Sequence, residues 1–157
     1  MASGFALREA ALVTEDECLV RFGLTPRPED VAEVRRLLDA ETAKGVDGED
    51  SSVVRLLCVQ LFHIADLGDV LRIWRAKRAN FDNGCSVDVQ LLCGAGLAET
   101  RAFLRREGSA GALEALEYLD ECVGTEDFVE FSVAAARAEH ARYYGHFAEE
   151  DERTLEP

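Results

Sequence analysis

Apolar residues recur at helical spacing through most of the chain, in segments that are separated by glycine, proline and helix-capping residues. Val31, Val34 and Leu38 are one example, since positions three and four apart lie on the same side of a helix. No segment alternates between apolar and polar residues for long enough to predict a strand. The connections are about 2 to 6 residues long, which favours antiparallel helix neighbours. We therefore predict an all-α fold of about seven or eight short antiparallel helices, stacked as helical hairpins in a short α-solenoid or a compact bundle.

Capping residues, proline and glycine set the boundaries of the first two helices. Thr14 and Glu17 have the spacing of a capping box, which predicts a helix that ends at Gly23. Pro28 suits the first turn of the next helix, because an N–H at that position would lack an intrahelical partner. Gly45 supplies the stop for this second helix.

The segment from Val53 to Ala65 is apolar on nearly every side, which predicts a helix buried in the middle of the fold. Ser51 or Ser52 is expected to cap it. The segment from Asn80 to Gly84 predicts a turn, because Asn and Gly tolerate the left-handed conformation. Further helices are expected over residues 70–79, 86–93, 97–107, 113–119 and 125–144.

A length of 157 residues suits a single domain that buries roughly two-thirds of the surface of its unfolded chain. We assign residues 1–145 to one helical domain and predict that the acidic segment 146–157 is a disordered tail. No run approaches the roughly 20 apolar residues of a membrane span, and no secretory signal is evident, so we expect a cytoplasmic protein. The five cysteines are odd in number and form no C-x-x-C pair, which predicts reduced thiols. No cofactor is expected.

The net charge of −14 is unevenly distributed. Residues 69–106 carry seven positive and four negative side chains, whereas residues 107–157 carry three positive and 14 negative ones. A weakly basic segment therefore lies between two acidic ones. The molecule as a whole should repel nucleic acid and anionic lipid, so neither is an expected partner.

Two short motifs suggest a repeat. Leu56-Leu57-Cys58 and Leu91-Leu92-Cys93 lie 35 residues apart, and each is followed by a segment that carries arginines. At the level of class, residues 53–107 resemble the HEAT and ankyrin kinds of helical repeat protein, and Leu61 to Ala65 with Gly68 is similar to the start of an ankyrin unit. This resemblance implies a binding scaffold and transfers no functional residue.

Cations cluster near the ends of two expected helices. If these helices are equivalent members of stacked hairpins, they run parallel and their C-terminal ends lie on one edge. Such a ridge could bind an acidic partner, a phosphorylated ligand or an acidic segment of the same chain. The simpler interpretation is that the cations complement the helix dipoles. The predicted basic ridge consists of Arg75, Lys77, Arg78, Arg101, Arg105 and Arg106.

Three further residues could be structural or functional. Trp74 has the spacing of a core residue. His63 lies in the most apolar segment, and Asp66 three residues later could orient its imidazole for acid–base chemistry, although a core histidine is the simpler interpretation. His140 and His146 are predicted to lie on the surface.

Asp82 and Asp88 flank the predicted turn, where they could cap helices or form a buried acid pair. Cys85 and Cys93 with His63 are a possible metal-binding set, which we do not favour. No spacing typical of a catalytic triad, a Cys–His pair or a metal site is evident.

The pattern favours a non-catalytic intracellular protein-binding module, such as an adaptor or a bacterial immunity protein. It would bind through the basic ridge or through an acidic face from Glu114 to Glu130. The alternative is a small enzyme or small-molecule binder with a pocket among His63, Trp74, Arg75, Asp82 and Asp88. The candidate partner- or ligand-binding residues are Trp74, Arg75, Lys77, Arg78, Asp82, Asp88, Arg101, Arg105 and Arg106.

Overall fold

The computed structural model describes residues 13–48 and 50–154, with side chains as far as Gly145. These residues form eight α-helices and five short 3-10 helices, and they contain no strand. The α-helices are α2 (Glu15–Phe22), α3 (Val31–Ala43), α4 (Ser51–Ile64), α5 (Val70–Arg78), α6 (Phe81–Ser86), α7 (Leu97–Glu107), α8 (Ala110–Val123) and α9 (Val133–Thr154). The 3-10 helices are η1 (Pro28–Asp30), η2 (Gly45–Asp47), η3 (Leu67–Asp69), η4 (Val89–Cys93) and η5 (Glu126–Phe128).

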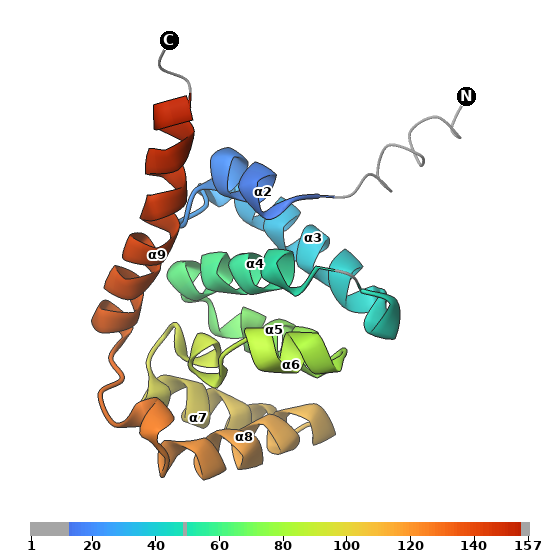
Figure 1. Ribbon diagram of the computed structural model, residues 1–157. Coiled ribbons are helices and arrows are strands. Elements are labelled where there is room, and N and C mark those ends of the chain that lie inside the picture. Colours follow the sequence, from blue (N-terminus) through green and yellow to red (C-terminus); the bar gives the residue numbers. More distant parts are fainter. Residues whose placement is uncertain (1–12, 49, 155–157) are drawn as a thin grey trace, which may run out of the picture.

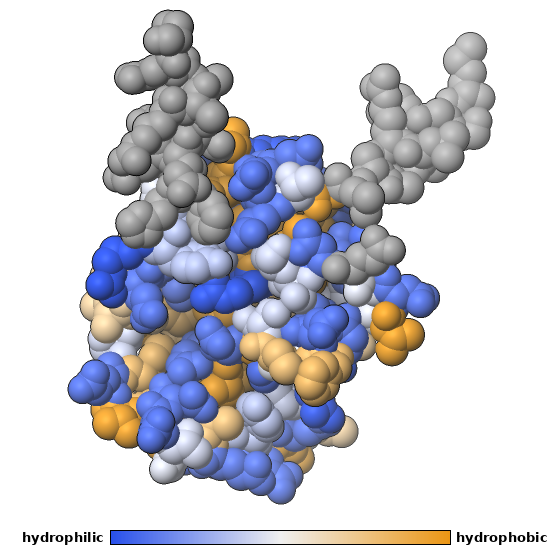
Figure 2. All heavy atoms as spheres, in the orientation of Figure 1, coloured by the Kyte–Doolittle hydropathy of each residue, from blue (hydrophilic) through white to orange (hydrophobic). Residues whose placement is uncertain are grey.

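The helices are stacked in the order of the chain, with α4 in the middle (Figure 1). α2, α3 and α6 pack on α4, and α5 packs on α3, α6 and the hairpin of α7 and α8. α9 runs along one edge of the stack (Figure 1). Hydrophilic side chains cover most of the face shown in Figure 2, with smaller apolar areas among them. The predicted all-α fold of short helices is thus confirmed.

The apolar sequence of α4 explains its central position. Ten of its fourteen residues are buried, because a helix that is apolar on nearly every side has to be covered by neighbours all round. The Gln60 side chain lies on the α2 side of this helix, where its Nε2 donates hydrogen bonds to the carbonyls of Cys18 (3.2 Å) and Gly23 (2.7 Å). α2 is therefore fixed on α4 by polar contacts as well as by apolar packing.

A glycine lets η4 approach α4 closely. A Cβ atom at Gly94 would lie 2.4 Å from the backbone oxygen of Phe62, a distance that real Cβ atoms do not show. Only glycine fits there without a shift of the backbone. Gly94 thus sets the spacing between the two elements from which part of the candidate site is built.

A buried ion cluster joins α3 to the start of α5. The carboxylate of Asp69 is 1% exposed and accepts hydrogen bonds from Arg35 Nε (2.8 Å) and Arg72 Nη1 (2.5 Å). Arg35 also contacts Asp66, and Arg72 contacts Asp39. Two guanidinium groups therefore compensate one buried carboxylate, and each also holds a more exposed acid.

Several predicted boundaries are wrong because a side-chain cap takes a different role. The helix predicted over residues 113–119, for example, begins at Ala110 with Ser109 as its cap. Asp50, rather than Ser51 or Ser52, caps α4. The segment 80–84 is not a turn: the side chain of Asn80 accepts a hydrogen bond from the N–H of Asn83 (2.7 Å) and so begins α6. Thr125 caps η5, and the last helix begins only at Val133.

The two similar motifs do not lie in equivalent helices. Leu56-Leu57-Cys58 belongs to α4, whereas Leu91-Leu92-Cys93 lies in the 3-10 helix η4 where residues 86–93 were predicted to form a helix. All six side chains are buried, so both motifs supply core residues. The chain is all-helical, as the resemblance to helical repeat proteins implies, but its second half is not a copy of its first.

The predicted tail begins inside a helix. α9 extends to Thr154, past the predicted domain boundary at residue 145. The side chains of residues 146–157, among them His146, lie outside the described ones, so the disorder of this tail stays a prediction.

Candidate functional site

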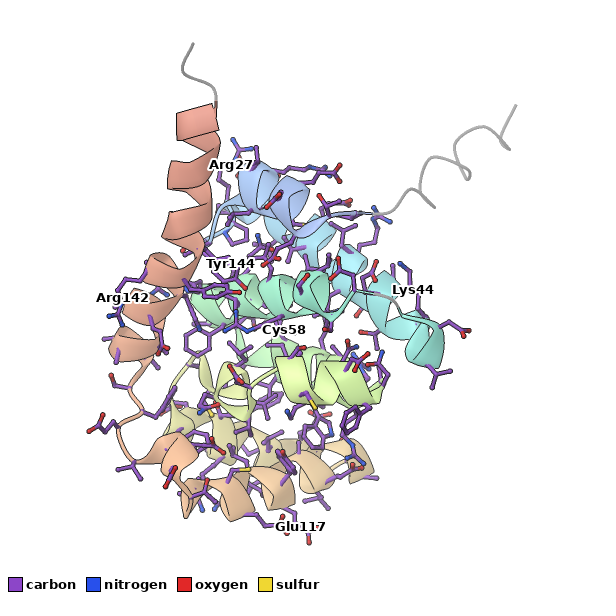
Figure 3. The ribbon with its side chains drawn as sticks, in the orientation of Figure 1. Arg27, Lys44, Cys58, Glu117, Arg142 and Tyr144 are labelled. Atoms are coloured by element: carbon purple, nitrogen blue, oxygen red, sulfur yellow. The ribbon has the colours of Figure 1, made fainter. Side chains whose placement is uncertain are left out.

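Specific polar contacts hold α9 against the stack. Tyr144 is 2% exposed and its hydroxyl accepts a hydrogen bond from Arg55 Nη1 of α4 (2.8 Å). His140 Nδ1 and His63 Nε2 lie 3.0 Å apart, and Arg137 Nη1 donates to the carbonyl of His63 (3.0 Å). Figure 3 shows Tyr144 pointing from α9 towards α4. These contacts attach one side of α9 to α4. Beside the first turns of α9 there is a space between the elements.

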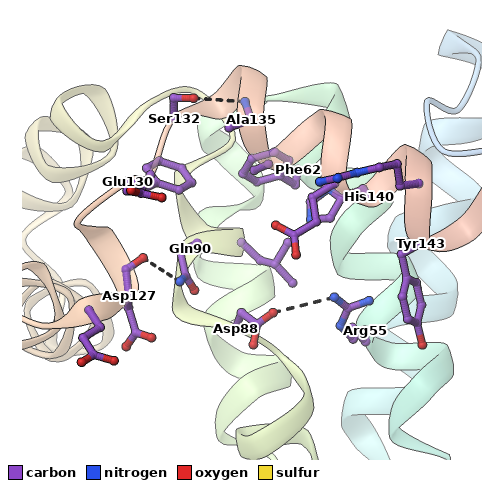
Figure 4. A pocket seen from close by; sticks show the side chains of 16 residues that line it. Arg55, Phe62, Asp88, Gln90, Asp127, Glu130, Ser132, Ala135, His140 and Tyr143 are labelled. Carbon is purple, nitrogen blue, oxygen red and sulfur yellow. Dashed lines mark hydrogen bonds and ion pairs between the residues drawn. The ribbon is translucent and has the colours of Figure 1, made fainter.

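This space is a cleft of about 480 Å³ between α9, α4, η4 and η5 (Figure 4), which we call the α9 cleft. Five carboxylates and two guanidinium groups line it, so its walls carry a net negative charge. The charged lining residues are Arg55, Asp88, Glu126, Asp127, Glu130, Glu139 and Arg142.

Three large apolar side chains lie among the polar groups that line the α9 cleft. They are Phe62, Leu91 and Phe131, and the ring of His140 lies edge-on to Phe62 with the ring centres 5.3 Å apart. Apolar side chains beside placed polar groups are common in ligand-binding pockets.

Hydrogen bonds within the connection from η4 to α9 position the acidic rim. Gln90 Nε2 donates to the carbonyl of Asp127 (2.8 Å), and the hydroxyl of Ser132 accepts from the N–H of Ala135 (3.0 Å) at the start of α9. On the opposite wall, Arg55 lies 3.8 Å from Asp88 (Figure 4). The carboxylates around the cleft are therefore carried by a fixed backbone.

The two histidines beside the α9 cleft are neutral at pH 7. Burial lowers the pKa of His63 to about 4, and the neighbouring His140 and Arg137 act in the same direction. Burial also lowers the pKa of His140 to about 4, aided by Arg55 and Arg137. Because one nitrogen of each ring takes part in the bond between them, one ring is its donor and the other its acceptor.

His63 is a core histidine, in agreement with the simpler interpretation of the sequence. It is 7% exposed, and its Nδ1 lies 3.5 Å from the hydroxyl of Thr25. Asp66 does not orient this ring, since its carboxylate bonds to the N–H of Gly68 and to Arg35. The prediction that His140 lies on the surface is wrong, because the ring is 8% exposed.

The structure does not bring the six cations of the predicted ridge together. Lys77 is buried, and its ammonium donates hydrogen bonds to the carbonyls of Gly84 (2.7 Å) and Val87 (2.5 Å). Burial lowers the pKa of this amine. Lys77 therefore satisfies backbone oxygens at the end of α6 and is not available to a partner.

Two further ridge cations are paired with α8. Arg78 lies 3.0 Å from Glu114, and its guanidinium also lies over the ring of Trp74. Arg101 Nε lies 2.9 Å from Asp120, as an ion pair whose N–H is not aligned for a hydrogen bond. The cause is topological: α7 pairs with α8, and α8 also packs on α5, so α5 and α7 are not equivalent members of stacked hairpins.

The other three ridge cations are exposed. Arg75, Arg105 and Arg106 form no ion pair with another residue in the described part of the chain. Trp74 belongs to the core, as predicted, since it is 4% exposed and packs on Tyr118 with ring centres 5.4 Å apart.

The five residues of the alternative pocket lie apart. Asp88 lines the α9 cleft, and His63 is buried behind His140. Trp74 and Arg75 line a shallow groove between α5 and the start of α8, and Asp82 is exposed in the first turn of α6. Of the five, the α9 cleft contains Asp88 and the groove beside α5 contains Trp74 and Arg75.

An acidic surface extends from α8 to the α9 cleft. We call it the acidic face, and Leu113 is an exposed apolar residue beside it. Glu117 and Glu121 are exposed on α8, while Glu126 and Glu130 continue the surface to the rim of the cleft. The acidic face consists of Glu114, Glu117, Asp120, Glu121, Glu126, Asp127 and Glu130.

Comparison of the chain with protein-family models, with curated proteins and with solved structures gives no match. None of the described helices has the length and apolar character that a membrane span requires. Among the side chains that the structure describes, no group of three or more from His, Cys, Asp or Glu is arranged to hold a metal ion. Cys85 is exposed whereas Cys93 and His63 are buried, so the possible metal-binding set is divided between surface and core.

Proposed function

We propose that the protein is a non-catalytic binding module, of the adaptor or immunity type, that binds a basic protein partner through its acidic face. One observation favours the acidic face over the basic ridge, the two binding surfaces predicted from the sequence. Half of the basic ridge is used inside the fold, where Lys77 is buried and Arg78 and Arg101 pair with α8. Glu117, Glu121, Glu126 and Glu130 are instead exposed and form no ion pair with another described residue.

Electrostatics supports a basic partner. The net charge of −14 creates a negative potential that attracts a positively charged protein and raises its association rate. The exposed acids Glu117, Glu121 and Glu126 form no ion pair with another described residue, so a partner's Lys and Arg side chains need not displace internal ones. The exposed Leu113 adds apolar area at the edge of this surface.

The test is a comparison of two charge variants in affinity capture with mass spectrometry. One variant carries Glu117→Gln, Glu121→Gln and Glu126→Gln on the acidic face. The other carries Arg75→Gln, Arg105→Gln and Arg106→Gln, the exposed cations of the basic ridge. We expect a partner of high isoelectric point that the wild type and the arginine variant retain and the glutamate variant loses. Loss of the partner from the arginine variant alone would transfer the function to the basic ridge.

A further inference from the structure

We propose that the α9 cleft receives a short segment of the basic partner and that an arginine side chain of this segment reaches His140. This inference rests on the proposed function and specifies the site at which the partner inserts. Continuity supports it, since Glu126, Asp127 and Glu130 belong both to the acidic face and to the lining of the cleft. A partner on the acidic face thus lies at the mouth of the cleft.

The charges of the α9 cleft favour a cation. Its two guanidinium groups face five carboxylates. Arg55 is already engaged, since it contacts Asp88, donates to the Tyr144 hydroxyl and lies over the ring of Tyr143. Glu130 and Glu139 are exposed and form no ion pair with another described residue. Glu130 precedes α9 and Glu139 lies in it, and both line the cleft, where a guanidinium can pair with carboxylates.

His140 provides a second, independent observation at the inner end. More than nine-tenths of the residue is buried, yet it lines the α9 cleft. Its Nδ1 bonds to His63, and its Nε2 has no hydrogen bond to another described residue. When His140 Nδ1–H donates to His63 Nε2, and His63 Nδ1–H donates to the Thr25 hydroxyl, His140 Nε2 is an acceptor. In this tautomer His140 offers an acceptor to the cleft, and together with the carboxylates at the rim it matches a cationic hydrogen-bond donor.

The shape of the cleft favours arginine over lysine. Phe131 lines it beside the carboxylates, and a planar guanidinium can stack on such a ring while it bonds to acids in the same plane. An ammonium is more strongly hydrated and offers no planar face. A volume of about 480 Å³ exceeds that of one side chain, so several residues of the partner enter together.

Peptide binding to the full chain tests this site. The probes are three peptides, Gly-Gly-Xaa-Gly-Gly with Xaa arginine, lysine or citrulline, the last being a neutral analogue of arginine. Titration followed by NMR should show saturable binding of the arginine peptide with shifts of the His140 ring signals. We expect the citrulline peptide to bind at least about tenfold more weakly than the arginine peptide, because it lacks the charge. The lysine peptide should bind several-fold more weakly than the arginine peptide. Equal affinity for the arginine and citrulline peptides, or no saturable binding, would overturn the proposal.

A matched pair of variants separates the cleft from general attraction. Glu130→Gln with Glu139→Gln should weaken binding of the arginine peptide about tenfold. Asp47→Ser with Glu107→Gln removes the same charge in η2, just after α3, and at the end of α7, away from α9 (Figure 1), and should change the affinity by less than about twofold. An equal loss of affinity for the arginine peptide in the two variants would show that general electrostatic attraction, and not the cleft, holds the peptide.

The outcome also distinguishes this inference from the proposed function. If the basic partner binds the acidic face and the Glu130→Gln, Glu139→Gln variant binds it as well as the control variant does, only the cleft proposal fails. If no basic protein binds while the arginine peptide still occupies the cleft, the proposed function fails and the site remains as a receptor for small cations.

Discussion

Nε2 of His63 and Nδ1 of His140 lie 3.0 Å apart, and this hydrogen bond joins the central helix α4 to α9. Both rings are buried, and Arg137 lies beside them. Burial and the neighbouring Arg137 therefore disfavour a proton on either ring. The attachment of α9, and with it the wall of the α9 cleft, depends on both rings being neutral.

Stability should accordingly fall when the pH is lowered from about 6.5 to about 4. The unfolded chain binds protons on these histidines near their ordinary pKa of 6.5, whereas the folded chain binds them only near 4. Between these values the unfolded state holds more protons, so the free energy of unfolding decreases as the pH falls and levels off below the folded pKa. We expect a loss of about 1 to 3 kcal/mol from the pair, measured by urea denaturation across this range.

A double variant isolates this contribution from that of the carboxylates. His63→Leu with His140→Leu removes both titrating rings and keeps the site apolar. The slope of stability against pH between 4 and 6.5 should then be smaller than in the wild type. An unchanged slope would mean that the two histidines do not couple folding to pH.

Gly94→Ala should destabilise the fold, because its methyl group would meet the Phe62 carbonyl at 2.4 Å. We expect a loss of about 1 to 3 kcal/mol in the free energy of unfolding. Gly111→Ala is the control, since a Cβ there meets nothing within 4 Å and alanine favours a helix. Thermal denaturation should show this control to be neutral or more stable by about 0.5 kcal/mol. Equal behaviour of the two variants would contradict the close packing of η4 on α4.

Asp69→Asn should cost about 2 to 4 kcal/mol, because it leaves Arg35 and Arg72 around a buried neutral amide. Asp39→Asn removes the more exposed partner of Arg72, where a half-exposed pair contributes less than about 1 kcal/mol. Chemical denaturation of both variants provides the comparison. A similar small loss in the two would show that the Asp69 cluster is as weak as a surface pair.

Lys77→Met should destabilise the protein by about 2 to 3 kcal/mol, because it leaves the carbonyls of Gly84 and Val87 without their donor. Arg75→Met, on the exposed side of the same helix, should change stability by less than about 0.5 kcal/mol. Neither substitution should alter binding of the basic partner. A binding loss in Arg75→Met would restore the basic ridge as an interface.

The fold class could be predicted because local signals agreed with one another. The apolar residues of α4 indicated a buried central helix, and the capping box at Thr14 and Glu17 indicated the start of α2. The segment 80–84 was mispredicted because Asn83 followed by Gly84 is typical of a turn, while Asn80, three residues earlier, is a good helix cap. Contacts with the rest of the fold decide between a turn and a helix at this segment. Here Asn83 is buried, and its side chain donates a hydrogen bond to the carbonyl of Ala76.

The site could not be predicted, because its parts are distant in the sequence. Arg55, Asp88, Glu130 and His140 meet only after α9 has packed along α4. One local signal was available: Arg137, His140 and Tyr144 recur at spacings of three and four residues, which would have placed His140 on the buried side of the last helix. The prediction of the basic ridge was wrong because it assumed that α5 and α7 are equivalent members of stacked hairpins. The sequence could not establish this arrangement.

Hydrogen exchange of the complex with the basic partner tests the proposed interface most directly. Binding to the acidic face should protect the backbone amides of α8, η5 and the first turns of α9, and leave those at the ends of α5 and α7 unchanged. Protection at 75–78 and 101–106, with α8 and η5 unaffected, would contradict the assignment and return the function to the basic ridge.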